Sequence, residues 1–302
     1  MTRILIVFAA LLVAVSSDAA MLSGQFKGRY GALEIYDAQS KLSFRVNTPR
    51  LAERLTPCQT YLWPHMAIAL GTGVIKDSDS RIAFDSAKHP NAVSWPEAWR
   101  RDQTFDSALK DAVPWYASEL STRMGSARLT QNLKRIKYGN GDISCGLDKF
   151  WDTSSMKITS LEQVDFVRNF RDGKLGFNAR VTQLLKDALV LERTPEYTIY
   201  GMAGSCAHDA TATKYIGWLV GYVERPGKVW YYAMNIDAKA IADFGTARLD
   251  IVRGAMAEMG FIPAPPALVE PPAAPAAEPA PAVAAPAATV PPKPLPKPKK
   301  PR

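Results

Sequence analysis

Apolar residues recur along this chain in two periods, one typical of strands and one typical of helices. Alternation in GQFKGRYGALEIYDAQSKLSFRV, from Leu33 to Val46, predicts a β-hairpin that turns near residues 38–41. The next apolar run, PCQTYLWPHMAIALG at residues 57–71, begins with proline and ends with glycine. This pattern predicts a buried helix, and it makes this helix the first candidate for the centre of the fold.

The middle of the chain has a helical pattern interrupted by loops. The polar run KDSDSRIAFDSAKHPNAVSWPEAW predicts a loop with one short strand. Apolar residues then lie at helical spacing from Phe105 to Met124, with Pro114 as an interruption and Gly125 as the end. A loop, YGNGDISCGLDKFW, and two amphipathic helices follow; the helices are expected around residues 160–170 and 179–190.

The last third of the folded part returns to the strand pattern. TIYGMAGS predicts a strand that begins near Thr198. The runs YIGWLVGYVE and VWYYAMNID are joined by the turn at residues 225–228, which predicts a second hairpin. A final helix is expected from about Thr246 to Met259, ending at Gly260.

Both ends of the chain differ in composition from the part between them. The start, MTRILIVFAALLVAVSSDAA, has one arginine, a short apolar run and small residues, which predicts a signal peptide at residues 1–20; a retained anchor is the alternative. We therefore expect a periplasmic or secreted protein with no membrane span in its mature form. Residues 263–302 are rich in Pro, Ala and Lys, and they predict an extended, disordered tail.

The net charge of +8 does not indicate nucleic-acid binding. From Ala264 onward the tail has five Lys or Arg and two Glu, so it accounts for +3 of the +8. The rest of the chain has no stripe of arginines with interleaved aromatic residues to read bases. The basic end of the tail instead suggests contact with anionic envelope polymers, with a solubilising spacer as the simpler interpretation.

The helix at residues 57–71 resembles a motif of a known family. Class D β-lactamases and the related β-lactam sensor domains have P-x-S-T-[FY]-K-[IW]-P-N at this point, and this chain has P-C-Q-T-Y-L-W-P-H. Gln59 therefore replaces the serine, and Leu62 replaces the lysine. The family residues that remain in register are Pro57, Thr60, Tyr61, Trp63 and Pro64.

Other family motifs are present along residues 24–262. The Y-G-N triplet is Tyr138 to Asn140, and D-K-F-W ends at Trp151. Asp111 replaces the second serine, and Met202 replaces the lysine of K-T-G, of which Gly204 remains. Further matching residues are Trp99, Arg101, Asp102, Thr104, Val113, Trp115, Tyr116 and Gly125. Arg248 lies where the family has an arginine that binds the substrate carboxylate; a solvent-facing arginine is the alternative.

The resemblance implies an α/β fold of the α+β type. We expect a domain at residues 21–262 with a central antiparallel sheet flanked by helices. The sheet is built from the early hairpin and the strands near Thr198, Tyr215 and Val229, and the first and last helices cover it. An all-helical subdomain at about residues 84–190 is expected to close one side of the ligand cleft.

The family reaction, as the resemblance implies it, begins when a serine attacks the lactam carbonyl. Its base is a lysine held as a carbamate and shielded by tryptophan. A nucleophile needs a lone pair and an adjacent base, and the carboxamide of Gln59 is no such group. Leu62 accepts no proton, Met202 removes a cation, and Asp111 adds a negative charge to a pocket for an anion. We therefore expect these four positions to be vestigial.

Neighbouring residues provide few substitutes for the missing groups. Cys58 is a better nucleophile than serine, but its i+3 neighbour is Tyr61, and Thr60 has no base one turn away. His65 follows Leu62 by one turn, and we expect a capped or exposed imidazole there rather than a base. The run Cys206, His208 and Asp209 is too weak to predict a metal, so no metal or cofactor is expected.

Export would place the three cysteines in an oxidising compartment. One disulfide and one thiol are then arithmetically allowed, but the sequence does not fix the pair. By the resemblance, Cys58 precedes the serine position and Cys206 follows the K-T-G strand, which would place both near the pocket floor. We expect three small buried thiols.

The sequence thus predicts a secreted, catalytically inactive protein of this fold that binds a ligand or envelope partner noncovalently. The expected partner is a peptidoglycan-like or β-lactam-like ligand, and no nucleic acid. The ligand cleft is expected to include Tyr138, Asn140, Trp151, Gly204 and Arg248. Two alternatives remain: an active β-lactamase or penicillin-binding enzyme with a non-standard nucleophile, and an envelope protein that acts through its tail.

Overall fold

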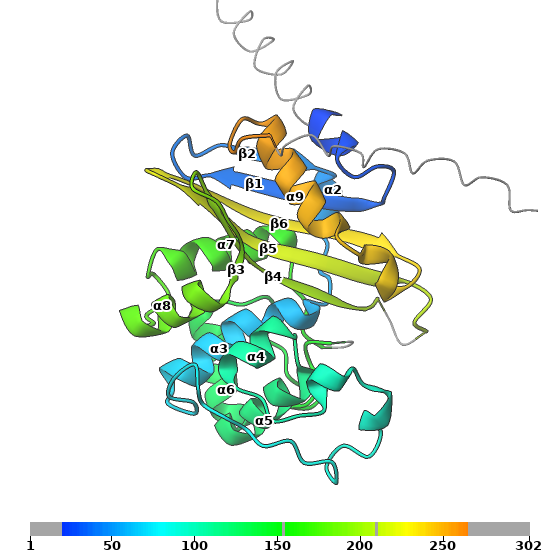
Figure 1. The fold of residues 1–302 in the computed structure, drawn as a ribbon, viewed down its shortest axis with the longest axis vertical. Helices are drawn as coiled ribbons and strands as arrows, with labels where there is room; N and C mark the ends of the chain where they lie inside the picture. Colours follow the sequence, from blue (N-terminus) through cyan, green and yellow to red (C-terminus); the bar gives the residue numbers. More distant parts are fainter. Residues whose placement is uncertain (1–19, 153–154, 209–210, 265–302) are drawn as a thin grey trace, which may run out of the picture. The chain divides into compact units, whose positions relative to one another are not determined.

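The computed structural model describes residues 20–152, 155–208 and 211–264, and its centre is a six-stranded antiparallel sheet (Figure 1). The strand order is β2-β1-β6-β5-β4-β3. This arrangement confirms the predicted mixed fold with a central antiparallel sheet. The strands are β1 (Gly31–Asp37), β2 (Ser43–Val46), β3 (Val190–Arg193), β4 (Thr198–Ala207), β5 (Tyr215–Arg225) and β6 (Lys228–Ala238).

Strands β5 and β6 are almost continuously apolar because both faces of the sheet are covered. They form a hairpin in which Arg225 pairs with Lys228 next to the turn. Successive side chains of a strand point to opposite faces, so Trp218 and Val220 enter one core cluster, whereas Leu219 enters the other. The two faces of one strand therefore contribute to two separate cores.

The helices divide between the two faces. Helix α9 (Ala247–Glu258) covers the face whose core includes Leu219 (Figure 1). Helix α3 (Leu62–Gly71) is buried from Leu62 to Leu70 and belongs to the core of the other face, with the helical region around it. The remaining helices are α2 (Thr48–Leu51), η1 (Cys58–Tyr61), η2 (Ala92–Ser94), η3 (Glu97–Trp99), α4 (Phe105–Lys110), α5 (Pro114–Met124), α6 (Ser126–Ile136), α7 (Ser160–Arg171), α8 (Ala179–Ala188) and η4 (Ile241–Phe244).

Helix α6 and strand β3 are among the elements that the sequence-based prediction lacks. Helix α6 begins directly after Gly125, whose φ of 75° ends α5, and it buries Leu129, Leu133 and Ile136. Its apolar residues are few, and the preceding glycine indicates an end rather than a new start. Strand β3 is four residues long at the edge of the sheet, and it begins at Val190, where the expected helix ends.

The expectation of three buried thiols is wrong. Cys58 and Cys206 form a disulfide, with a sequence separation of 148 and a Cα–Cα distance of 5.5 Å. Cys145 is a free thiol and is exposed. The pairing follows from the packing of η1 against β4, a long-range contact that three cysteines in a sequence do not specify.

The predicted signal peptide and tail fall almost wholly outside the described residues, at 1–19 and 265–302. In the described part of the chain, no helix has the length and apolar character that crossing a membrane requires.

Candidate functional site

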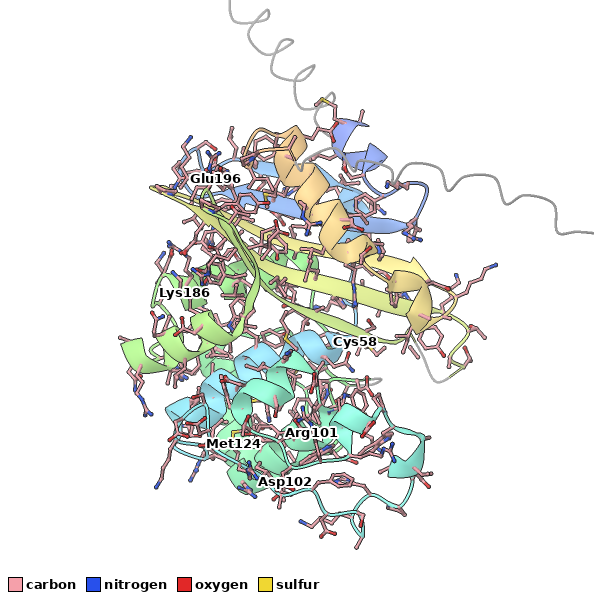
Figure 2. The ribbon with its side chains drawn as sticks, viewed as in Figure 1. Cys58, Arg101, Asp102, Met124, Lys186 and Glu196 are labelled. Carbon is pink, nitrogen blue, oxygen red and sulfur yellow. A yellow bond between two sulfur atoms is a disulfide. The ribbon has the colours of Figure 1, made fainter. Side chains whose placement is uncertain are left out.

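The site predicted from the family motif lies where η1 packs against strand β4. Figure 2 shows Cys58 beside the sheet, at the start of this contact. Gly204 permits the close approach, because a Cβ atom there would lie 2.6 Å from the amide nitrogen of Thr60 and 2.8 Å from that of Gln59. The glycine retained from K-T-G is therefore a packing requirement of the site. The disulfide between Cys58 and Cys206 joins the same two segments.

The side chain of Gln59 is bonded to strand β4. Its carbonyl oxygen Oε1 accepts a hydrogen bond of 2.7 Å from the backbone N–H of Ser205. This donor lies beside the residue position of the family nucleophile and would otherwise be able to polarise a bound carbonyl group. In this protein the side chain of residue 59 itself occupies it.

Arg248 is also bonded to this segment. Its Nη1 donates to the carbonyl oxygen of Gly204 at 3.0 Å and to Oγ of Ser205 at 2.7 Å. Burial of the guanidinium lowers the pKa of Arg248. The structure thus brings together Gln59, Gly204 and Arg248, three of the predicted positions, through Ser205.

Leu62 is fully buried, and aromatic rings surround the helix turn that holds it. Tyr61 stacks on Trp151 at a centroid distance of 5.6 Å, and its ring lies 5.8 Å from that of Tyr138. Among the described residues, no partner accepts a hydrogen bond from the buried indole Nε1 of Trp151. A tryptophan donor without an acceptor fits the loss of the base that the family places in this region.

Thr60 and Tyr138 belong to a buried hydrogen-bond network that ends on helix α7. The hydroxyl of Thr60 donates to the carbonyl oxygen of Pro57 at 2.6 Å and accepts from Nε2 of Gln163 at 3.0 Å. The hydroxyl of Tyr138 donates to Oε1 of Gln163 at 3.3 Å. Both hydroxyls are thus structural groups that orient η1.

His65 is fully buried, so the expectation of a capped or exposed imidazole is only half right. Nδ1 lies 3.0 Å from the hydroxyl of Tyr61, and Nε2 lies 3.0 Å from the carbonyl oxygen of Ala117. Burial lowers the pKa of His65 to about 4, and the pKa of Tyr61 is raised well above its usual value. A neutral imidazole bonded on both sides acts here as a structural group.

The buried imidazole makes stability depend on pH. The unfolded state binds a proton near pH 6.5, whereas folded His65 binds one only near pH 4, so stability falls as pH drops through that window. We expect a loss of about 2–3 kcal/mol at pH 4.5 from this group alone. Urea unfolding of the wild type and of His65→Gln at pH 7 and 4.5 measures it. Equal pH dependence of the two proteins would contradict the assignment.

Asp111 lies at the position of the family's second serine and forms an ion pair with Arg101. Its Oδ2 is 3.2 Å from Nη2 of Arg101, and its backbone carbonyl accepts from the indole N–H of Trp99 at 2.8 Å. Figure 2 shows Arg101 in the helical region, away from Cys58. The carboxylate therefore has a cationic partner, and the charge predicted for the pocket is compensated.

The other predicted positions have different surroundings. Met202 is buried in the same core as Leu62, so no cation replaces the K-T-G lysine at that point of β4. Asn140 is exposed, and its side chain bonds the backbone of Ser155 and Lys157 at 2.8 and 3.0 Å. It therefore orders its own loop.

The side chains that could have replaced the missing catalytic groups form other bonds in the structure. The sulfur of Cys58 is in the disulfide, so it is no thiolate nucleophile while the bond is intact. Cys206 is its partner and offers no metal ligand, and His208 bonds Oδ1 of Asp237 at 2.8 Å. Asp209 lies outside the described residues.

Two residues of the site are missing from the sequence-based list, Ser205 and Gln163. Ser205 bonds Gln59 through its backbone N–H, which no side-chain pattern predicts, and Arg248 through its hydroxyl. Gln163 lies on α7, about a hundred residues from Thr60 in sequence, and a glutamine on a helix is ordinarily read as a surface residue. Its position on the buried face of that amphipathic helix is the one signal available in the sequence.

Comparisons with known proteins agree with this geometry. The sequence matches the family described as "Penicillin binding protein transpeptidase domain" over residues 36–257. It is 30% identical to beta-lactamase OXA-48 of Klebsiella pneumoniae over 68% of this chain and 75% of that protein. It is 29% identical to the probable beta-lactamase YbxI of Bacillus subtilis strain 168 over 79% of this chain and 84% of that protein.

Solved structures show the same relationship. The class D β-lactamase YbXI from Nostoc has a TM-score of 0.73 and 28% identity, covering 79% of this chain and 98% of that chain. The class D β-lactamase FUS-1 (OXA-85) from Fusobacterium nucleatum subsp. polymorphum has a TM-score of 0.74 and 25% identity, covering 80% and 98%. The resemblance noted in the motifs is thereby confirmed. The chain belongs to the penicillin-binding protein transpeptidase family and has the fold of the class D β-lactamases.

Proposed function

We propose that this protein is a catalytically inactive member of its family, exported to the periplasm or secreted, which recognises its ligand without forming a covalent bond. The observation that carries the proposal is the position of Gln59. It stands in place of the serine and bonds the Ser205 amide through its own carbonyl. A carboxamide held in this way has no proton to lose and no base beside it.

The surroundings of Gln59 support the same proposal. The lysine position is the buried Leu62, and the hydroxyl of Thr60 is bonded on both sides. Cys58 is in a disulfide, which counts against an active enzyme that uses this thiol. Each loss alone would lower a rate, but together they remove the nucleophile and its base.

The ligand we propose is peptidoglycan-like or β-lactam-like. The framework of the family site is retained in Tyr138, Trp151, Gly204 and Arg248, and Arg248 is the cation at the position that the family uses for a carboxylate. Binding would require this guanidinium to exchange its bonds to Gly204 and Ser205 for bonds to the ligand. The basic tail would add contact with anionic envelope polymers by charge alone.

Fluorescent penicillin tests the proposal. The mature protein is incubated with the probe and run on a denaturing gel beside an active class D β-lactamase, and we expect no labelled band for this protein. A Cys145→Ser variant controls for reaction with the exposed thiol. A covalent band that survives in Cys145→Ser and disappears on mutation of Gln59, Thr60 or Cys58 would overturn the proposal.

Repeating the experiment with a reductant distinguishes our proposal from the alternative of an active enzyme that uses Cys58 as its nucleophile. Reduction frees the thiol of Cys58, so labelling or nitrocefin turnover that appears only in reductant and is lost in Cys58→Ala would identify it as the nucleophile. Our proposal predicts no turnover above the Cys58→Ala control in either condition.

A further inference from the structure

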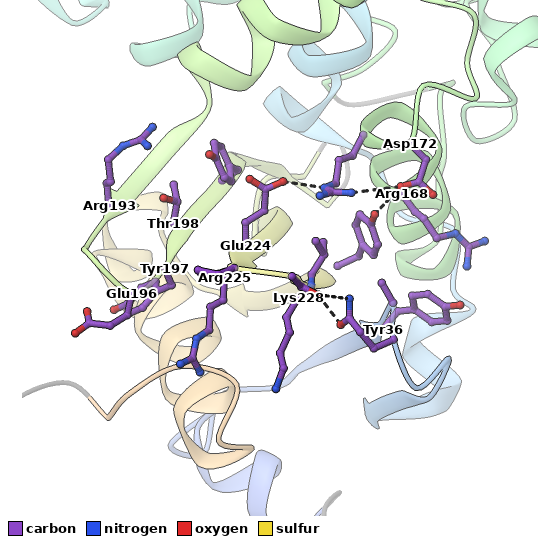
Figure 3. Close-up of a pocket in the computed structure, with 18 of the residues that line it drawn as sticks. Tyr36, Arg168, Asp172, Arg193, Glu196, Tyr197, Thr198, Glu224, Arg225 and Lys228 are labelled. Atoms are coloured by element: carbon purple, nitrogen blue, oxygen red, sulfur yellow. Dashed lines mark hydrogen bonds and ion pairs between the residues drawn. The ribbon is translucent and has the colours of Figure 1, made fainter.

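A second concave site lies at one end of the sheet, where three hairpin turns meet. We call it the end groove; it has a volume of about 960 Å³ (Figure 3). Its lining includes the turn after β1 with Lys41, the turn between β5 and β6 with Lys228, and the turn between β3 and β4 with Arg193. None of these residues belongs to a family motif described above.

The end groove is distant from Gln59. Thr198 lines the groove at the start of β4, and Ser205 bonds Gln59 seven residues further along the strand. At about 3.3 Å per residue, these two points are about 23 Å apart. Ligand binding in the end groove would therefore be independent of the family site. It is a function in addition to the one proposed for that site.

The acidic side chains in the floor of the groove are already paired. Glu224 accepts from Nε of Arg171 at 2.9 Å and from Nζ of Lys186 at 2.7 Å. Asp172 accepts from the Tyr231 hydroxyl at 2.9 Å and pairs with Lys174 at 3.0 Å (Figure 3). These partners lower the pKa of both carboxyl groups against the effect of burial, so both are ionised and compensated.

Cations on the rim of the groove have no such partners. Within the part of the chain that the structure describes, Lys41, Arg193 and Lys228 form no ion pair, and all three are exposed. Arg225 donates to the backbone carbonyl of Phe261 at 3.0 Å and keeps its charge uncompensated. Glu196 is the remaining carboxylate in the lining. The rim therefore has an excess of positive charge.

The sheet order arranges these cations in a row. The three turns join β2 to β1, β6 to β5 and β4 to β3, and these pairs follow one another across the sheet. With neighbouring strands about 4.8 Å apart, successive turns are about 10 Å apart, so the row is about 20 Å long. One small anion cannot contact all three turns, whereas a chain with repeated negative charges can.

The aromatic rings in the groove are occupied by protein groups. The guanidinium of Arg168 lies 4.8 Å from the centroid of the Tyr36 ring. Tyr200 stacks on Tyr222 at 4.6 Å, and Nζ of Lys186 lies 5.2 Å from its centroid. Proteins that bind single-stranded nucleic acid stack bases on free aromatic faces, whereas Tyr197, Tyr200 and Tyr231 of the lining are buried. The groove suits the charges of a polymer rather than bases.

We propose that the end groove binds a linear polymer of phosphate groups that carries no bases. Arg193 and Arg225 provide planar forks for phosphate oxygens, and Lys41 and Lys228 provide point charges between and beyond them. Binding of this kind releases counterions, so the affinity should fall steeply with salt.

Inorganic polyphosphate of about 15 units is the probe, titrated by calorimetry into the full chain. A Lys41→Ala, Arg193→Ala, Lys228→Ala variant removes three rim cations. The matched control is Arg128→Ala, Lys134→Ala, Lys149→Ala, which removes the same charge from exposed positions outside the groove. We expect the groove variant to bind at least about tenfold more weakly, with a smaller salt dependence, and the control to bind within about twofold of the wild type.

Other outcomes overturn the proposal. Equal losses in the two triple variants would assign binding to net charge or to the basic tail, which both variants retain. Orthophosphate that competes at similar concentrations of phosphate would indicate a site for a single anion. Single-stranded DNA that binds more tightly than polyphosphate would show base recognition. If polyphosphate does not bind at all, the end groove is not a polyphosphate site. Matching thermal melts of both variants establish that neither result reflects unfolding.

Discussion

Loss of the disulfide in a Cys58→Ser, Cys206→Ser variant is expected to lower the free energy of unfolding by about 4–5 kcal/mol. The bond closes a loop with a sequence separation of 148, and a cross-link of that length removes much of the conformational entropy of the unfolded chain. It also joins η1 to β4 at the position where Gln59 bonds Ser205. The effect should therefore reach the site as well as the global stability.

Chemical denaturation of both proteins without reductant measures this loss. Cys145→Ser is the matched control, because this thiol is exposed and unpaired, and it should change stability by less than about 0.5 kcal/mol. If the double variant unfolds at the same denaturant concentration as the control, the disulfide does not form in solution or does not constrain the chain.

A Leu62→Lys variant should destabilise the protein by about 3–5 kcal/mol at pH 7. Residue 62 is fully buried among apolar and aromatic side chains, and an ammonium group there loses its hydration. Leu62→Met is the matched control, because it keeps the apolar character and similar volume, and it should cost less than about 1.5 kcal/mol.

The pH dependence of this variant identifies the cause. Burial lowers the pKa of the new amine in the folded state, so the unfolded state binds more protons, and stability should rise with pH until the unfolded lysine titrates near about 10. Urea unfolding between pH 7 and 10 measures the rise. A Leu62→Lys variant as stable as Leu62→Met at pH 7 would instead show that this position still accommodates the family lysine, for example as a carbamate that accepts from the buried indole N–H of Trp151.

The arrangement of most helices and strands can be predicted from the sequence, because the local hydrophobic pattern and the family motifs indicate the same elements. The apolar runs of β5 and β6, the proline and glycine around the central helix, and Gly125 between two helices all correspond to observed boundaries. Helix α6 and strand β3 were not predicted, because a short edge strand and a helix that starts next to a glycine have weak sequence signals.

The sequence predicts which residues occupy the family positions, but it does not predict the bonds that they form. Motif register alone placed Gln59, Leu62 and Gly204. The disulfide, the acceptor role of the Gln59 carbonyl and the pairing of Asp111 with Arg101 depend on which backbone and side-chain atoms meet in space. Contacts between residues more than a hundred positions apart follow from the packed fold and not from a local pattern. The same holds for the end groove, whose cations come from three separate turns.

We propose that residue 59 is not acylated by β-lactams and that no neighbouring group replaces the family serine. Intact-protein mass spectrometry after incubation with excess benzylpenicillin tests this most directly, with an active class D β-lactamase treated in parallel. Because the lactam opens without a leaving group, acylation adds the whole mass of the penicillin. We expect an unchanged mass for this protein; an added penicillin mapped by peptide analysis to residues 57–62 would show that the site is acylated.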